Sequence, residues 1–569
     1  MTKFIKMLRN ISGLLVYYSA IVQILASTPP PNVCLQTSGA CYRGSWLNSS
    51  LGNTYASFQG LKYAQAPIGQ LRFKPPNTFV PGEAVFDVSK NFKVICPQIG
   101  MVDDIYTGQE DCLYLNVYVP ENALLESDDK YPVMVWIHGG GLQQGSGSFE
   151  EYGPQHFMDN EVIIVTMNYR LGPLGYLFLG KDDVVGNAGL QDQRLALQWV
   201  NDNIADFGGD PSLITIFGES AGSFSVSLHM LSPQSEGLFQ RVIMQSGTVL
   251  GSSWGMITTE NALASAKSLS FVLGCDSEED ELDCLQEKAA EDIIVKSRFE
   301  NVIPGRIIWM PAPDYGYSAN PFIPGEPEDL MSSGNFNRDV EVIIGTNADE
   351  GILFFFEFLL NPSQWDILKD NFDILGPSAL FNIAMASHIT QEDVKKAHQI
   401  IDFYVGGSDN INQEHTQGML DMMTDAGFLH GTHKSIKYLL AQKITLYHYI
   451  LTYEGEYSFT QLFGVDPAGV CHADDLQYQW EPIFNLSSPM TGGLGPLRGS
   501  DLIVRNKIVS AWTNFAKIGD PTPPDSEYSW TPLAPGNENN FLNISGTTPE
   551  MDYSEYIKQR MDIWNVILG

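Results

Sequence analysis

Short runs of apolar residues, many of them β-branched or aromatic, recur along the chain between longer amphipathic or irregular stretches. The runs cover residues 131–137, 162–169, 212–217, 241–246, 340–345 and 444–453. Their hydrophobic positions are nearly continuous and do not alternate with polar ones. That pattern is typical of strands that are buried on both faces of a sheet. We therefore expect these runs to be the central strands of the fold.

The segment 192–207 follows a different period. Its residues Leu195, Trp199 and Ile204 recur at helical spacing and give the segment a broad apolar face. Alternation of strand, helix and strand predicts an α/β fold with a large, mostly parallel central sheet covered by helices. The stretches 255–335 and 355–440 are more helical or irregular, and we expect them to be extended helical excursions from that sheet. We see no internal repeat and interpret residues 28–569 as a single α/β domain.

The N-terminus has the layout of a secretory signal. Lys3, Lys6 and Arg9 precede an apolar run from about residue 11 to about residue 26, and a proline-rich stretch follows. The alternative is an uncleaved anchor, but the run is short for a full membrane span. We expect residues 1–27 to be removed and the mature protein to be secreted. No later segment predicts a stable membrane anchor, and the C-terminus lacks the tail of a lipid-anchor signal.

The composition excludes some classes of function. Of the 569 residues, 44% are hydrophobic and 17% are charged, which is typical of a folded globular chain. The formal net charge is −35, so most of the surface repels phosphate backbones, and no basic run is present. We therefore expect no nucleic-acid partner. An acidic surface favours solubility but identifies no substrate.

The seven cysteines fit an oxidising compartment. Neither C-x-x-C nor H-E-x-x-H occurs, so we expect no metal site. Sequential pairing would close short loops at 34–41, 96–112 and 275–284 and leave Cys471 over, although spacing alone does not determine the connectivity. Sequons for N-glycosylation occur at Asn48, Asn485 and Asn543.

Two G-x-S-x-G patterns occur in the chain, and their contexts differ. Ser220, in TIFGESAGSF, follows a strong strand and precedes a segment that can begin a helix. A sharp strand-to-helix turn exposes a serine oxygen at the carboxyl edge of a sheet, which suits a nucleophile. Ser253, in GSSWG, follows no strand, and Trp254 would crowd an attacking group. We take Ser220 as the candidate nucleophile and GSSWG as accidental.

A glycine-rich loop offers hydrogen-bond donors for such a nucleophile. Gly139, Gly140 and Gly141 come directly after the strand 131–137. Backbone N–H groups without a neighbouring Cβ can approach a substrate oxygen, so Gly140, Gly141 and Ala221 would form a three-donor oxyanion hole. The alternative, a phosphate-binding loop, is disfavoured because neither G-x-x-x-x-G-K nor a well-placed G-x-G-x-x-G follows the strand.

The serine also needs a base and an acid that orients it. Most of the ten histidines have structural explanations, such as a strand position for His448 or support of the glycine loop for His138. His472 lies in a loop beyond a strong strand, where its imidazole could reach the sheet edge. Asp349 and Glu350 both follow the strand 340–345, and spacing does not decide between them. The order serine, acid, histidine is expected for this type of sheet.

These segments resemble the type-B carboxylesterase/lipase (cholinesterase-like) family of α/β-hydrolases, and in particular secreted insect esterases. The resemblance runs from about residue 33 to about residue 535. The motifs that carry it are FQGLKYAQAPIGQLRFKPP (58–76), EDCLYLNVYVP (110–120), HGGG (138–141), GNAGLQDQRLALQWVNDNIADFGGDPSLITIFGESAG (186–222), GTNADEG (345–351), GVCHADD (469–475) and AWTNFAKIGDP (511–521).

The resemblance implies a set of site residues. The triad would be Ser220, Glu350 and His472, which selects Glu350 as the acid. It implies disulfides Cys96–Cys112 and Cys275–Cys284, and we extend the pattern to Cys34–Cys41. The implied reaction is two-step acyl transfer on a small-molecule ester, with no cofactor and no metal. Glu219, beside the serine, would tune the charge of the site.

Some positions depart from the family pattern. Ser223 replaces a frequent glycine, and we expect it to stiffen or narrow the site. The 96–112 segment contains no tryptophan, which argues against the quaternary ammonium site of cholinesterases. Relatives that degrade juvenile hormone often carry glutamine where this chain has Glu219, which argues against that substrate without excluding it. We therefore predict a serine carboxylesterase acting on small to medium lipophilic esters. The alternatives are a catalytically silent adhesion or binding protein and a lipase for longer acyl chains.

Overall fold

A computed structural model describes residues 29–568, apart from residues 91, 102, 126–129, 182, 254, 278, 299–307, 362, 384–387, 466–468, 482–495 and 525. The expected signal segment, 1–27, lies outside the described residues, as does the sequon at Asn485.

The described chain is organised around an eleven-stranded sheet with the order β18-β17-β16-β15-β14-β13-β9-β10-β8-β4-β3. The strands, in chain order, are β3 Ser45–Asn48, β4 Thr54–Lys62, β8 Tyr114–Pro120, β9 Tyr131–Ile137, β10 Ile163–Met167, β13 Gly209–Glu219, β14 Arg241–Gln245, β15 Glu341–Asn347, β16 Leu446–Leu451, β17 Asn540–Ile544 and β18 Glu550–Tyr553.

The middle of this sheet is parallel and its ends are antiparallel. Every neighbouring pair from β17 to β10 runs parallel. The pairs β10–β8, β8–β4 and β4–β3 at one end, and β17–β18 at the other, run antiparallel. The expected mostly parallel sheet is confirmed, and the nearly continuous apolar runs form its parallel strands apart from β17.

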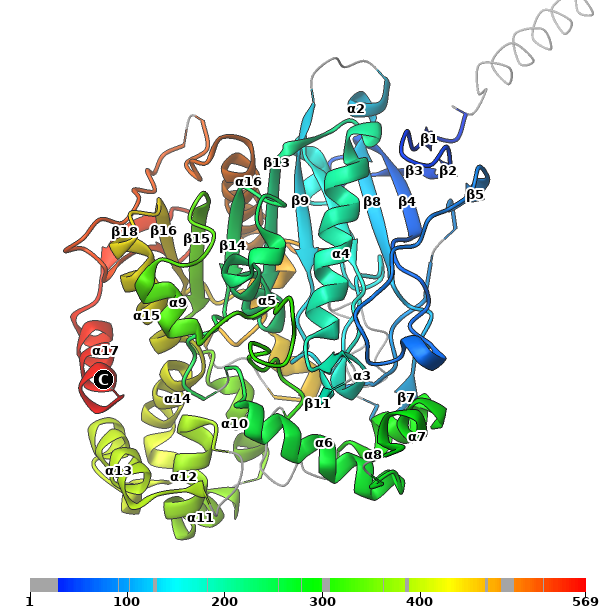
Figure 1. Cartoon of the computed structure of the whole chain (residues 1–569). Coiled ribbons are helices and arrows are strands. Elements are labelled where there is room, and N and C mark those ends of the chain that lie inside the picture. The colour runs from blue at the N-terminus through cyan, green and yellow to red at the C-terminus, as the bar shows by residue number, and fades with distance from the viewer. Residues whose placement is uncertain are drawn as a thin grey trace, which may run out of the picture.

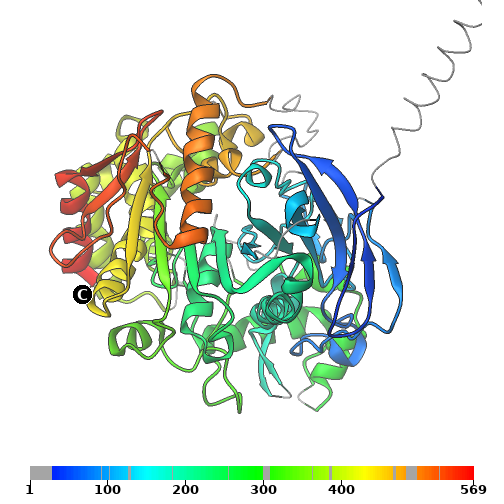
Figure 2. The ribbon, with the colours of Figure 1, turned by 90° about the horizontal axis from the view of Figure 1, so that it is seen from above.

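Both faces of the sheet are buried, because successive residues of a strand point to opposite sides. In β9, Val133, Val135 and Ile137 join one hydrophobic cluster, whereas Met134 and Trp136 join another. The first cluster includes side chains of α4 (Ala188–Asn203) and α5 (Ala221–Leu231), and the second includes those of α16 (Ser500–Ile518). Figures 1 and 2 show α4 and α16 on opposite faces of the sheet.

The expected helical excursions gather at one end of the sheet (Figure 1). The helices there are α6 Thr259–Leu273, α7 Glu281–Glu287, α8 Ala290–Lys296, α10 Ile352–Leu360, α11 Ser363–Asp370, α12 Phe372–Phe381, α13 Gln391–Val405 and α14 Thr416–Thr424. α10, α13 and α14 share a third hydrophobic cluster with α17 (Glu555–Leu568). Beside the sheet lie α9 (Pro327–Ser333) and α15 (His430–Ala441).

Three disulfides link cysteines that are close in the chain. They join Cys34 to Cys41, Cys96 to Cys112 and Cys275 to Cys284, and Cys471 is buried and free. Within the described ranges, no helix combines the length and the apolar character that a membrane span requires.

Candidate active site

Ser220 lies at a strained turn between strand and helix. β13 ends at Glu219, α5 begins at Ala221, and Ser220 between them has φ of 58° and ψ of −124°. A non-glycine residue in this region is strained, and such strain is found at functional sites where the surrounding structure enforces it. The backbone N–H of Ser220 donates to the Gln245 carbonyl of β14, which fixes the turn.

The glycines around the turn are required by close packing. A Cβ on Gly218 would lie 2.5 Å from the carbonyl carbon of Gly222. A Cβ on Gly222 would lie 1.9 Å from the carbonyl oxygen of Ile137 in β9. Side chains at either position would push β13, α5 and β9 apart. The two glycines of the G-x-S-x-G pattern are therefore required by the tightness of the turn.

The glycine loop after β9 lies directly against Ser220. A Cβ on Gly139 would lie 3.1 Å from the Ser220 Cβ. Gly140 and Gly141 have φ of 94° and 63°, a region that favours glycine. Within the described chain, the N–H groups of Gly140, Gly141 and Ala221 donate to no protein acceptor. The loop thus leaves its donors beside Ser220 available to another molecule.

His138 supports the glycine loop and stacks on Tyr169. His138 Nδ1 lies 2.9 Å from the Gly139 carbonyl oxygen, so this nitrogen carries the donated proton. The imidazole stacks on Tyr169 with ring centroids 4.3 Å apart. Burial lowers the pKa of His138 to about 4, which keeps the ring neutral. His138 therefore supports the loop, as the sequence suggests.

The structure brings Glu350 and His472 together across 122 residues of chain. Glu350 Oε2 lies 2.6 Å from His472 Nδ1, and both side chains are buried. Asp349, the other candidate acid, accepts a hydrogen bond from the Val470 N–H at 3.0 Å. The Asp349 N–H in turn donates to the Val470 carbonyl. Glu350 orients the imidazole, and Asp349 holds the loop that carries it.

The other imidazole nitrogen contacts a second carboxylate. His472 Nε2 is 3.0 Å from Oε1 of Glu219, the residue directly before Ser220. The Ser220 hydroxyl has no hydrogen-bond partner among the residues that the structure describes. Ser220 is 6% exposed, so its side chain is nearly buried. The arrangement can supply a nucleophile, a base and an orienting acid for acyl transfer.

Comparison with known proteins identifies the family. A model of the carboxylesterase family matches residues 31–564. The chain belongs to this family.

Relatives within the carboxylesterase family cover most of the chain. Juvenile hormone esterase of Tribolium castaneum is 34% identical over 92% of this chain and 90% of its own length. Venom carboxylesterase-6 of Apis mellifera is 34% identical over 88% of this chain and 89% of its own length. The crystal structure of juvenile hormone esterase from Manduca sexta, with OTFP covalently attached, has a TM-score of 0.82 and 26% identity, covering 95% of this chain and 99% of that one. The chain is a carboxylic ester hydrolase with the α/β-hydrolase fold, and its family acts on small-molecule esters.

The charges in this carboxylesterase site are strongly coupled. Burial disfavours the imidazolium, but the carboxylates of Glu219 and Glu350 outweigh burial and hold the pKa of His472 well above its ordinary value. Burial raises the pKa of Glu219, against the opposing effect of His472. The resting site therefore favours a proton on the imidazole, and the base form appears only as the pH rises.

Asp474 and Asp475, just after His472, are two further buried carboxylates that the residue pattern does not single out. Asp474 accepts hydrogen bonds from the N–H groups of Phe459 and Cys471 at 2.6 and 2.8 Å. Asp475 accepts from Gln245 Nε2 at 2.6 Å. Burial raises the pKa of each to about 7. Two adjacent carboxylates between apolar residues were the signal in the sequence that could have identified this support.

The remaining sequence candidates lie as follows. Ser223 is fully buried, and its hydroxyl donates to the Gly247 carbonyl at 2.5 Å, so it ties α5 to the loop after β14. Ser253 lies in a loop, where its N–H donates to the Ala426 carbonyl at 2.9 Å. Asn48 is exposed at the end of β3. The side chain of Asn543, in β17, is hydrogen-bonded to both Thr452 and Asp552.

Proposed function

We propose that this carboxylesterase uses Ser220 as its nucleophile, with His472 as general base and Glu350 as the orienting acid. The observation that carries the proposal is the 2.6 Å contact between Glu350 and His472 beside the strained turn of Ser220. The glycine loop with its available N–H groups supplies the third requirement, stabilisation of an oxyanion.

The proposed reaction has two steps. The Ser220 oxygen attacks the ester carbonyl and gives its proton to His472 Nε2, while the N–H groups of Gly140, Gly141 and Ala221 bind the carbonyl oxygen as it becomes negative. The imidazolium then protonates the leaving alcohol, and an acyl-enzyme remains. Water attacks the acyl carbon, His472 takes the water proton, and the acid leaves as Ser220 regains its hydrogen. Glu350 stabilises the imidazolium in both steps.

Small to medium lipophilic esters are the proposed substrates. Phe428 packs on the face of His472 and Phe354 lies against Phe428, so the reacting bond would sit beside an apolar wall. Relatives named juvenile hormone esterase support a lipophilic ester of this size. Bile salt-activated lipase of Rattus norvegicus, 33% identical over 84% of this chain and 76% of its own length, keeps longer acyl chains as the second candidate.

Secretion is part of the proposal. The N-terminal segment has the layout of a signal, and three disulfides are typical of oxidising compartments. Expression of the full chain in insect cells, followed by mass spectrometry of the medium, should give a protein that begins near residue 28. Retention of the chain in the cells with residues 1–27 attached would contradict secretion.

Turnover of p-nitrophenyl esters of increasing acyl length tests the substrate class. The proposal predicts that kcat/KM is highest for short and medium acyl chains. Highest kcat/KM on long chains would favour the lipase. Treatment with an organophosphate, followed by peptide mapping, should place the adduct on Ser220. An adduct on another residue would reject the proposed nucleophile.

A further inference from the structure

The helix that runs beside the active site contains a π turn. α14 and α15 are joined without a break by η8 (Asp425–Leu429), a π-helical segment whose residues are all buried. A π turn inserts one residue into a helix and shifts every following side chain around the helix axis. Such turns are rare and occur frequently at functional sites, so the contacts made by this one are informative.

The π turn places the ring of Phe428 on the face of His472. The two ring centroids are 4.6 Å apart and the planes are inclined by 30°. Phe428 also stacks with Phe354, with ring centroids 5.9 Å apart. Carboxylates contact the imidazole at both ring nitrogens, but those contacts do not restrain its tilt. The Phe428 ring contacts the imidazole face and restrains this tilt.

The π turn is held by the C-terminal helix α17. The Arg560 guanidinium binds the Asp425 carboxylate through two hydrogen bonds, of 2.7 and 2.5 Å. Both side chains are buried, and the Tyr404 hydroxyl also donates to Asp425. Trp564 of α17 donates to the Tyr404 oxygen at 2.8 Å. A bidentate arginine–carboxylate pair has a fixed geometry, so α17 determines where the π turn lies.

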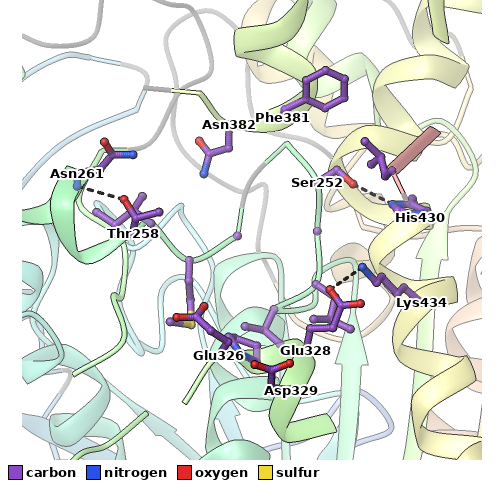
Figure 3. Close-up of a pocket in the computed structure, with 18 of the residues that line it drawn as sticks. Ser252, Thr258, Asn261, Glu326, Glu328, Asp329, Phe381, Asn382, His430 and Lys434 are labelled. Carbon is purple, nitrogen blue, oxygen red and sulfur yellow. Dashed lines mark hydrogen bonds and ion pairs between the residues drawn. The ribbon is translucent and has the colours of Figure 1, made fainter. Parts of the chain in front are cut away.

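Two further segments of the chain form hydrogen bonds with the π turn and the residue before it. The Ser253 N–H donates to the Ala426 carbonyl, and the Gly351 N–H, directly after Glu350, donates to Thr424 Oγ1 at 2.9 Å. Ser252 Oγ lies 2.8 Å from His430 Nδ1, as Figure 3 shows. Ser253 thus contacts the π turn, and Ser252 contacts the first residue of α15.

We propose that Phe428 is a positioning residue for His472, and that the Asp425–Arg560 pair acts on the reaction through Phe428. The inference rests on the proposed function, in which His472 is the general base. A base that is displaced by about 1 Å can lose about 10²-fold in rate. The C-terminal helix then stabilises the catalytic geometry as well as the fold.

The first experiment replaces the ring by an aliphatic side chain. Phe428→Leu should lower kcat for a p-nitrophenyl ester about 10- to 100-fold and change KM by less than about threefold. Phe428→Tyr keeps the ring and should restore most of kcat. Phe515→Leu, which removes a buried ring from α16, is the matched control and should lower the melting temperature without changing kcat. Rates are expressed per site titrated with an organophosphate, so unfolded protein does not contribute.

The second experiment tests whether the buried pair acts through Phe428. Asp425→Asn/Arg560→Gln removes both charges and should lower kcat about 3- to 10-fold. In the Phe428→Leu background the same pair of substitutions should cause no further loss. If the pair of substitutions lowers kcat by the same factor in both backgrounds, the pair does not act through Phe428 and this part of the proposal is overturned. A Phe428→Leu enzyme with kcat within about twofold of the parent would overturn the positioning role. Failure of the parent chain to hydrolyse esters would instead reject the proposed function.

Discussion

Substitution of Glu219 by glutamine should shift the pH dependence of the enzyme. Glu219 Oε1 lies 3.0 Å from His472 Nε2, and its carboxylate helps to hold the pKa of His472 above the ordinary value. Removing that negative charge destabilises the imidazolium and lowers the pKa of His472. Because the neutral imidazole is the active base, the acid limb of kcat/KM should move to lower pH.

The separation of the two groups sets the size of this shift. Coulomb's law gives about 1.4 kcal/mol for unit charges at 3.0 Å with the dielectric constant of water, and about 5.5 kcal/mol with an effective value of about 20. A pKa unit corresponds to about 1.36 kcal/mol, so the range is about one to four units. Burial raises the pKa of Glu219, which reduces its charge at low pH. We therefore expect a shift near the lower end.

The assay is kcat/KM for a p-nitrophenyl ester from about pH 4 to about pH 9, read at a wavelength where the two forms of the product absorb equally. Asp314→Asn is the matched control. It also replaces a fully buried carboxylate, but Asp314 accepts its hydrogen bonds from Phe322 and Ile323. The control should leave the acid limb in place. An acid limb that moves by less than about 0.3 units, or to higher pH, in Glu219→Gln would refute this electrostatic reasoning.

Two other substitutions separate the roles of neighbouring groups. Glu350→Gln should lower kcat about 10³- to 10⁴-fold, because the imidazole loses its orienting charge, whereas Asp349→Ala should lower it about tenfold or less, through the looser loop alone. Equal losses at the two positions would contradict this division. In Gly140→Ala, the new Cβ would lie 2.2 Å from the Gln144 carbonyl oxygen, at φ of 94°. The loop must then shift, and kcat should fall about 10²- to 10³-fold. The melting temperature of the variant is the control for loss of folding. Unchanged kcat would exclude Gly140 as a donor.

The central strands of the fold follow from its sequence, and the strands toward the edges of the sheet do not. A strand such as β9 is buried on both faces and therefore shows as an unbroken apolar run. β4, β17 and β18 contain more polar residues, since they lie toward the edges of the sheet, and the apolar pattern alone does not identify them. Segment 192–207 is helical, but α4 begins earlier, at Ala188, and ends at Asn203.

The site shows a similar division. The Ser220 turn and the glycine loop are local features, so the residue pattern is enough to locate them. The contact between Glu350 and His472 joins distant parts of the chain, and spacing could not choose between Glu350 and Asp349. The π turn depends on Arg560, which lies 135 residues beyond Asp425. Nothing in the local sequence around Phe428 indicates that its ring reaches His472.

The most direct test of the account is turnover by Ser220→Ala. The purified variant should keep the melting temperature of the parent, because the Ser220 hydroxyl makes no hydrogen bond within the described chain. Its kcat on p-nitrophenyl esters should fall about 10⁵- to 10⁶-fold, and organophosphate labelling should disappear. Undiminished kcat in the folded variant would contradict the account.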